Sequence, residues 1–231
     1  MKVAAIIPAA GESRRMGREI RKPFLRLQGM PILSVTLRNL MQSSQIDSFY
    51  VCIRAQDRKL CIEEILPHLP SGKRVEWVEG GKRRQDSVYN GLLRVDTDVD
   101  LILIHDGVRP FVCSHMVKTA IHETSQCGAT AFGLPVKETI KVVNKEGYVV
   151  RTVDRDELWS IQTPQTFERV LLRTAHQRAY ELDMQGTDDA SLVEKLGERV
   201  KILLGSPENI KVTTPVDLSI AERIISKWDL R

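Results

Sequence analysis

The chain has 231 residues, of which 42% are hydrophobic and 28% are charged, and its formal net charge at pH 7 is +4. This length suits one large α/β domain and allows the chain to bury about 70% of the surface that it exposes when unfolded. The mild net charge is not that of a typical nucleic-acid-binding domain and favours a small polyanion as the ligand of any local cluster of cations. No apolar run approaches the roughly 18 residues that a membrane span requires, so we expect no membrane association.

The four cysteines, Cys52, Cys61, Cys113 and Cys127, are widely spaced and form no C-x-x-C pair. This spacing is not that of a zinc site or a disulfide framework, so we expect reduced thiols in a cytoplasmic protein. The N-terminus begins a predicted strand almost at once and has no signal-peptide h-region, which also predicts a cytoplasmic location.

The hydrophobic pattern predicts strands and helices that alternate over the first part of the chain. Short apolar runs predict strands at residues 3–7, 49–53, 75–78, 101–104 and 129–134. Helical spacing predicts helices after Pro31, at about residues 56–66, from Arg84 and after Ser114. Four such alternations predict an α/β fold with a Rossmann-like, mostly parallel sheet flanked by helices. In such sheets, ligands bind outside the carboxyl ends of the strands.

The pattern changes in the second part of the chain. Residues 139–143 and 148–152 flank a four-residue loop that contains glycine, which predicts a protruding β-hairpin. Because an isolated hairpin is marginally stable in water, we expect this one to lie against another surface, and a second subunit is the candidate. Residues 159–167, which follow the hairpin, are expected to be an irregular return segment.

Further elements complete the chain. The sequence predicts a helix at about residues 168–182, a short helix that ends near Gly197 and a strand at 200–204. Residues 209–212 then lead back to a final helix that Thr214 caps and Pro215 opens. We see no repeat, low-complexity tract or linker. We therefore expect a single domain over residues 1–231, with residues 137–158 protruding as a dimerisation arm.

The loop after the first predicted strand has the composition of a phosphate-binding loop. Pro8 ends the strand, and Ala9, Ala10 and Gly11 are small enough for a ligand to approach the backbone N–H groups. Cations follow at Arg14, Arg15, Arg18, Arg21 and Lys22. The loop contains neither a Walker A motif nor G-x-G-x-x-G, so it is not a P-loop and a dinucleotide fold is not favoured. An ordinary turn followed by a solvated basic face remains the alternative.

Asp106 ends the most apolar predicted strand and stands beside Gly107. If this strand neighbours the first one, the carboxylate of Asp106 reaches the first loop. Mg²⁺ typically binds through one or two carboxylates together with substrate phosphates, so Asp106 is a candidate metal ligand. A capping or turn aspartate is the alternative. Arg109 contacts substrate or forms a salt bridge to Asp106.

Four further residues are candidates with weaker signals. Gly80 and Gly81 break the strand at 75–78 and permit close approach of a planar base, and Ser87 offers a hydroxyl to a ring edge. A turn and a helix start explain the same residues equally well. Lys211 is either a phosphate ligand or a surface cation.

Taken together, these segments resemble the 2-C-methyl-D-erythritol 4-phosphate cytidylyltransferase family, which belongs to the non-mevalonate isoprenoid pathway. The resemblance covers essentially the whole chain, and the order and spacing of the motifs make it specific. The motifs are Pro8-Ala9-Ala10-Gly11, Arg15-Met16, Lys22, Gly80-Gly81, Asp86-Ser87-Val88, His105-Asp106-Gly107-Val108-Arg109-Pro110, Val153-Asp154-Arg155, Thr163-Pro164-Gln165, Thr187-Asp188-Asp189-Ala190 and Asn209-Ile210-Lys211-Val212-Thr213.

The resemblance implies roles for particular residues. The catalytic residues around the α-phosphate of CTP would be Arg15, Lys22 and Lys211. The nucleotide-binding residues would be Pro8, Ala9, Ala10, Gly11, Gly80, Gly81 and Ser87, with Asp106 near Mg²⁺ or another divalent cation. The substrate-binding residues would be Arg109, Thr139, Arg155, Thr163 and Thr187. In this family the arm, which carries Thr139 and Arg155, reaches into the partner subunit, so the resemblance implies a homodimer.

The implied reaction is direct nucleotidyl transfer of the nucleotidyltransferase type. A phosphate oxygen of 2-C-methyl-D-erythritol 4-phosphate attacks the α-phosphorus of CTP in line, and pyrophosphate leaves. The product is 4-diphosphocytidyl-2-C-methyl-D-erythritol. Because the nucleophile is already an anion near neutral pH, no general base is required. Fixed cations and the metal then supply catalysis by positioning and electrostatic stabilisation.

Two other functions stay open on the sequence. The first is ribitol-5-phosphate cytidylyltransferase activity on the same fold, which a comparison of the two acceptors with CTP distinguishes. The second is a non-catalytic nucleotide-binding regulator, which would release no pyrophosphate from CTP with either acceptor. A nucleic-acid binder is disfavoured because the cations cluster at one loop without an aromatic stacking platform.

Overall fold

The body of the molecule is a seven-stranded sheet with the strand order β11-β7-β10-β6-β1-β4-β5. The computed structural model spans the chain, and its described residues are 1–11 and 21–228. The strands are β1 (Val3–Pro8), β4 (Ser48–Ile53), β5 (Arg74–Glu79), β6 (Leu101–Ile104), β7 (Ala129–Pro135), β10 (Trp159–Glu168) and β11 (Lys201–Leu204). β1 pairs in parallel with both β4 and β6, which confirms that the first loop and Asp106 follow neighbouring strands.

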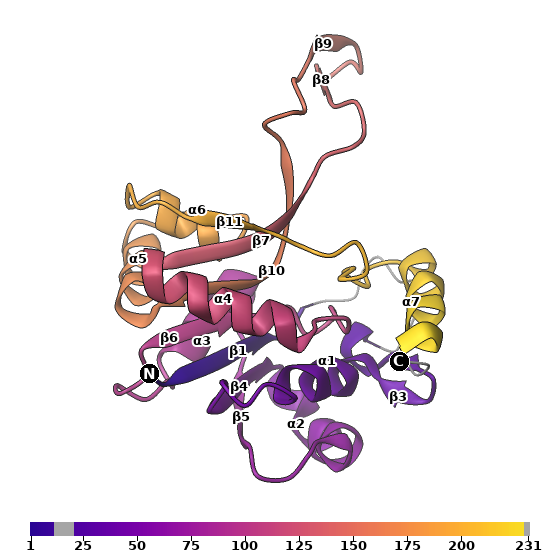
Figure 1. Cartoon of the computed structure of the whole chain (residues 1–231), viewed down its shortest axis with the longest axis vertical. Helices are drawn as coiled ribbons and strands as arrows, with labels where there is room; N and C mark the ends of the chain where they lie inside the picture. The colour runs from indigo at the N-terminus through magenta and orange to yellow at the C-terminus, as the bar shows by residue number, and fades with distance from the viewer. Residues whose placement is uncertain (12–20, 229–231) are drawn as a thin grey trace.

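Helices cover both faces of the sheet (Figure 1). They are α1 (Ile32–Met41), α3 (Arg84–Leu92), α4 (Ser114–Cys127), α5 (Arg169–Glu181) and α6 (Asp189–Glu194). Successive side chains of β1 point to opposite faces, so Ala5 and Ile7 join the core under α1 and α4, whereas Ala4 and Ile6 join the core under α3 and α5. This two-sided burial confirms the predicted α/β architecture.

The sheet is mostly parallel, but β10 runs antiparallel between β6 and β7. The prediction that residues 159–167 are irregular was therefore wrong. The pairing of β10 with β7 shifts register between Gln162 and Gln165, around Pro164, which has no N–H for the ladder. This interruption breaks the two-residue periodicity by which the sequence would reveal a strand.

The predicted helix at residues 56–66 is a succession of short turns. A 3₁₀ turn (Ala55–Asp57), α2 (Arg58–Leu60), a π turn (Cys61–Ile65) and a 3₁₀ turn (Leu66–His68) follow one another. The sequence predicted that this helix ends before Pro67, but Pro67 lies inside the last 3₁₀ turn. Proline is tolerated there because the first residues of a helical turn donate no N–H to that turn.

The final helix, α7 (Pro215–Trp228), begins as predicted. The hydroxyl of Thr214 accepts a hydrogen bond from the Asp217 N–H at 3.2 Å, and the Asp217 carboxylate accepts one from the Thr214 N–H at 2.8 Å. This reciprocal pair satisfies two N–H groups at the start of the helix. α7 packs beside a small hairpin made of β2 (Arg26–Leu27) and β3 (Met30–Pro31) through the core that contains Ala221.

The predicted hairpin is present and stands away from the body (Figure 1). It consists of β8 (Lys141–Val143) and β9 (Val149–Thr152), which pair antiparallel between the ends of β7 and β10. Its large apolar side chains are exposed to solvent, namely Ile140, Val142, Val143, Tyr148, Val149 and Val150. Within residues 1–11 and 21–228, no helix combines the length and apolar character that crossing a membrane requires.

Candidate active site

A pocket of about 270 Å³ lies where the loops after β1, β5 and β6 meet. Its lining residues are Pro8, Ala9, Ala10, Gly11, Lys22, Pro23, Gly81, Lys82, Arg83, Arg84, Ser87, Asp106, Val108, Lys211 and Thr213. Most of the candidate nucleotide-binding and metal residues are therefore in one pocket, at the sheet edge where the sequence predicted it. Lys211 arrives there from the segment between β11 and α7.

The first loop is held in place by its backbone. The Ala9 N–H donates to the Cys52 carbonyl at 2.8 Å, and the Arg54 Nε–H donates to the Ala10 carbonyl at 3.0 Å. Among the described residues, no atom lies within 4 Å of a Cβ built on Gly11. Packing against the described part of the protein therefore does not require glycine here, and that part leaves space beside Gly11 for a ligand.

The glycines after β5 serve the loop itself. A Cβ on Gly80 would lie 2.4 Å from the Cβ of Ala10, so only glycine lets the two loops meet, and Gly80 does not line the pocket. The Gly81 N–H donates to the buried hydroxyl of Ser87 at 3.1 Å, and that hydroxyl donates to the Arg83 carbonyl at 3.1 Å. The side chain of Ser87 therefore fixes the position of Gly81 at the pocket wall.

Three cations surround the carboxylate of Asp106, which is only 5% exposed. Arg84 Nε lies 2.9 Å from Oδ1, and Lys211 Nζ and Arg109 Nε lie 2.8 and 3.5 Å from Oδ2. Burial alone would raise the pKa of Asp106, but these ion pairs outweigh it and hold the pKa well below its usual range. Asp106 is therefore an anion throughout the neutral range.

A hydrogen-bonded layer behind Asp106 holds its backbone. The Asp106 N–H donates to Thr163 Oγ1 at 3.1 Å, and Thr163 Oγ1 lies 3.0 Å from His105 Nδ1. His105 Nε2 lies 2.9 Å from the Arg109 carbonyl, which can only accept, so Nε2 carries the proton. Burial lowers the pKa of His105 to about 4, so the imidazole is neutral.

Two candidate substrate-binding residues belong to this layer and do not line the pocket. Arg109 Nη1 donates to the Asn209 carbonyl at 2.7 Å, and Asn209 Nδ2 donates to the Thr163 carbonyl at 2.7 Å. Arg109 and Thr163 thus connect the loop after β6 to β10 and to the segment that carries Lys211. In this conformation they position Asp106 and Lys211 from behind.

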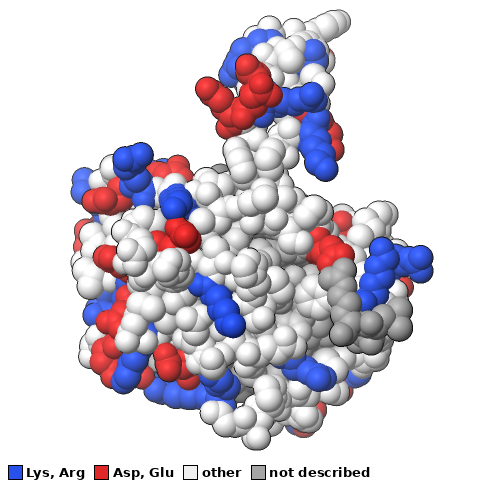
Figure 2. Space-filling model, in the orientation of Figure 1, with Lys and Arg blue, Asp and Glu red and all other residues white. Residues whose placement is uncertain are grey.

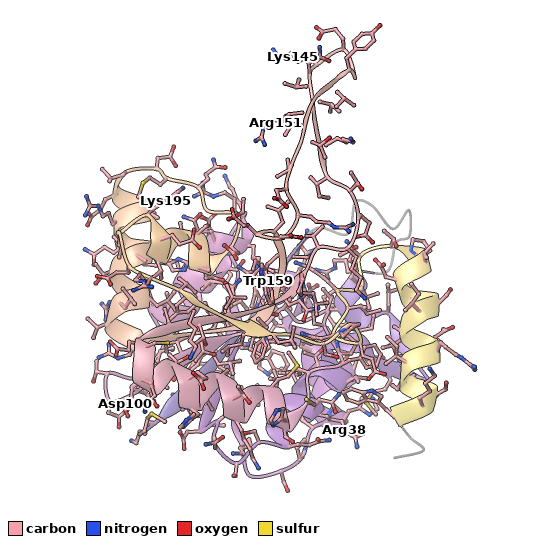
Figure 3. The ribbon with its side chains drawn as sticks, turned by 45° about the horizontal axis from the view of Figure 1, so that its top comes forward. Arg38, Asp100, Lys145, Arg151, Trp159 and Lys195 are labelled. Atoms are coloured by element: carbon pink, nitrogen blue, oxygen red, sulfur yellow. The ribbon has the colours of Figure 1, made fainter. Side chains whose placement is uncertain are left out.

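The other candidate acceptor residues are not brought to the pocket of their own chain. Thr139 and Arg155 are exposed on the arm, where Arg155 Nη1 donates to the Lys137 carbonyl at 2.6 Å. Thr187 is exposed just before α6. Figure 3 shows the arm with its side chains, including the labelled Lys145 and Arg151, extending beyond the body. Arg15 lies outside the described residues.

Sequence reasoning gave no role to three charged residues that line the pocket, namely Lys82, Arg83 and Arg84. Arg84 was expected only as the start of a helix, yet it lines the pocket and contacts Asp106 and the buried Asp189. His176 lies behind Asp189 on α5. No local pattern signals this network, because a basic residue in the first turn of a helix is most often solvated, and its two carboxylate partners are distant in the chain.

Comparisons with known proteins show which family the chain belongs to. The profile of the family described as 2-C-methyl-D-erythritol 4-phosphate cytidylyltransferase (IspD) matches residues 3–227. Over 97% of its length the chain is 43% identical to the 2-C-methyl-D-erythritol 4-phosphate cytidylyltransferase of Desulforamulus reducens, of which it covers 96%.

Solved structures show the same relationship. The chain superposes on 4-diphosphocytidyl-2C-methyl-D-erythritol synthase from Anaerococcus prevotii with a TM-score of 0.86 and 30% identity, over 97% of this chain and 96% of that one. It superposes on 2-C-methyl-D-erythritol 4-phosphate cytidylyltransferase from Thermus thermophilus with a TM-score of 0.80 and 32% identity. This match covers 98% of this chain and 100% of the Thermus chain. The chain therefore belongs to the 2-C-methyl-D-erythritol 4-phosphate cytidylyltransferase family.

Proposed function

We propose that this protein transfers the cytidylyl group of CTP to 2-C-methyl-D-erythritol 4-phosphate, forming 4-diphosphocytidyl-2-C-methyl-D-erythritol and pyrophosphate. Family membership over nearly the whole chain supports this choice of nucleotide and acceptor. The observation that carries the proposal is one pocket in which a small-residue backbone loop faces Lys22, Lys211 and Asp106. Such a pocket suits a triphosphate, which needs N–H donors and cations on several sides.

Different residues of the pocket would bind the phosphates and stabilise the charge that develops during the transfer. The loop from Ala9 to Gly11 would bind the phosphates through its backbone, while Lys22 and Lys211 stabilise negative charge on the α-phosphate and on the leaving pyrophosphate. We assign Arg15 to the same task. The acceptor phosphate is already an anion, so the protein's part is to align it and to offset repulsion between two polyanions.

A divalent cation fits the donor set of this pocket. Among the described lining residues, Asp106 is the one acidic side chain, and Mg²⁺ commonly uses a single carboxylate together with substrate phosphates and water. No group of three or more acidic, cysteine or histidine side chains elsewhere in residues 1–11 and 21–228 is arranged to hold a metal ion. Asp106 would hold the ion, which when bound neutralises charge on the triphosphate.

The arm supports a homodimer as the working form. Its apolar side chains are strongly exposed, with Tyr148 at 74% and Val150 at 64%. At the base of the arm, Ile161 of β10 and Leu204 of β11 are also exposed. Both residues pair with Gly133 of β7, one from each side of that strand, so their side chains lie on the same face of the sheet. Figure 2 shows few charged side chains on the face below the arm. We assign this apolar surface to a second copy of the chain, whose Thr139 and Arg155 would contact the acceptor.

A cytoplasmic location is part of the same proposal. All four cysteines are free thiols, two of them buried, which is the usual state in a reducing compartment.

A pyrophosphate-release assay that crosses four nucleotides with two acceptors tests the proposed function. We expect release with CTP and 2-C-methyl-D-erythritol 4-phosphate, and at most slow release with the other three nucleotides or with ribitol 5-phosphate. Preference for ribitol 5-phosphate would identify the alternative cytidylyltransferase. The absence of release with either acceptor would instead favour a nucleotide-binding regulator.

A further inference from the structure

A buried ion network extends from the pocket into the core between α5 and α6. Arg84 Nη1 lies 2.6 Å from Asp189 Oδ2, and Asp189 Oδ1 lies 3.0 Å from His176 Nε2. Asp189 and His176 are each 1% exposed. Through Arg84, which contacts Asp106 at 2.9 Å, this network joins two helices to the candidate metal ligand.

The far end of the network is rigidly held. The N–H groups of Asp189 and Ala190 donate to Gln165 Oε1 at 3.2 and 3.1 Å, so β10 fixes the start of α6. The imidazole of His176 stacks on Tyr89 with an interplanar angle of 2°. Burial would raise the pKa of Asp189, but Arg84 and His176 together hold it below its usual range, so Asp189 is a fixed anion.

Arg84 holds Asp106 differently from Lys211. The Lys211 side chain is 39% exposed and reaches Oδ2 as a point charge, so it is able to turn toward a phosphate. Arg84 holds the other oxygen, Oδ1, and its guanidinium is tied to Asp189 on the opposite side. The planar, two-sided contact fixes the orientation of the Asp106 carboxylate even when Lys211 moves.

We propose that Arg84, anchored by Asp189 and His176, is a positioning residue that sets the orientation of Asp106 for nucleotidyl transfer. The inference rests on the proposed function. Its consequence is that residues in the core between α5 and α6, away from the pocket, determine the rate of the reaction. Loss of a comparable supporting contact behind a metal ligand typically lowers activity or metal affinity by about 10–100-fold.

The test uses Asp189→Asn in the full-length protein, because Asp189 does not line the pocket and the amide keeps the size of the side chain. We expect kcat for pyrophosphate release to fall about 10–100-fold while KM for CTP changes less than about threefold. Asp98→Asn is the control for the loss of one carboxylate charge, because Asp98 is exposed, pairs with Lys2 and does not line the pocket. It should retain wild-type kcat.

A double-mutant cycle with Asp106→Asn separates positioning from a structural role. If the network acts through Asp106, Asp189→Asn costs much less in the Asp106→Asn background than in the wild type. Equal losses in both backgrounds, or wild-type turnover of Asp189→Asn, would overturn the proposal.

A folding defect in Asp189→Asn would leave Arg84→Lys as the decisive variant, since lysine keeps the charge but cannot span two carboxylates. It should show the same loss of kcat, and wild-type kcat there would equally refute the positioning role. The wild-type assay run in parallel tells the two proposals apart. Without pyrophosphate release from the wild type, the proposed function fails; with it, an unaffected variant refutes the positioning role alone.

Discussion

The ammonium group of Lys211 lies 2.8 Å from the carboxylate of Asp106, although the two residues are distant in the sequence. Both line the same pocket. The contact places the candidate phosphate-binding cation and the candidate metal ligand side by side at the carboxyl edge of the sheet. A triphosphate that reached Lys211 would therefore also bring its oxygens next to Asp106.

Replacing Lys211 with methionine should abolish most turnover without unfolding the protein. We expect kcat to fall about 10²–10³-fold, by analogy with the loss of one donor to a developing oxyanion. The melting temperature should change little, because Asp106 keeps its contacts with Arg84 and Arg109. Lys201→Met provides the control, since Lys201 is an exposed lysine paired with Glu123 outside the pocket, and it should retain wild-type kcat.

Lys22 and Arg15 should prove equally important to turnover. Lys22 lines the pocket from the turn at Lys22–Phe24. Lys22→Ala and Arg15→Ala should each lower kcat at least about 100-fold while the far-ultraviolet circular dichroism spectrum stays unchanged. Near-normal turnover of either variant would remove that residue from the catalytic set.

Gly11, in the loop after β1, and Gly80, in the loop after β5, should respond differently to replacement by alanine. A Cβ at Gly11 meets no atom of the described residues within 4 Å, whereas one at Gly80 would lie 2.4 Å from the Cβ of Ala10. Gly80→Ala should therefore lower the unfolding free energy by about 1–3 kcal/mol, the usual cost of overpacking. Gly11→Ala should leave stability unchanged and weaken CTP binding. Urea unfolding and CTP titration calorimetry measure both effects, and the reverse pattern would contradict these assignments.

A charge on the arm should disrupt the dimer. Val150→Glu places a carboxylate in the apolar surface proposed for the second subunit, so sedimentation should show monomers and the acceptor KM should rise. Val170→Glu is a closely matched control, because Val170 on α5 is 65% exposed and Val150 is 64% exposed. A wild type that sediments as a monomer, or a Val150→Glu protein that stays dimeric, would count against the arm as the interface.

His105 should make the protein less stable in acid. Burial lowers its folded-state pKa to about 4, whereas an unfolded histidine titrates near 6.5. Between these values the unfolded chain binds a proton that the folded chain does not, so stability is full above pH 6.5 and falls as the pH drops toward 4. We expect His105 to account for about 2 kcal/mol of the loss between pH 7 and pH 5.

Urea unfolding of the wild type and of His105→Gln at both pH values tests this expectation, because glutamine does not titrate. The variant should lose about 2 kcal/mol less than the wild type over this interval. Parallel losses in the two proteins would show that another group carries the effect.

The features that could be predicted from sequence are those with a local signal. Apolar runs located β1 and β6, and a small-residue turn and a terminal carboxylate located the first loop and Asp106 at one edge of the sheet. Strand β10 was not predicted because Pro164 interrupts its hydrogen-bonded ladder. The contacts of Arg84 and Thr163 were not predicted because ion pairs and hydrogen bonds between distant segments leave no periodic pattern in the sequence.

A crystal structure with CTP and magnesium tests the central claim most directly. The account predicts that the triphosphate lies along the backbone from Ala9 to Gly11, with Lys211 on the α-phosphate and the metal against Asp106. A triphosphate bound away from that loop and from Lys211 would contradict it.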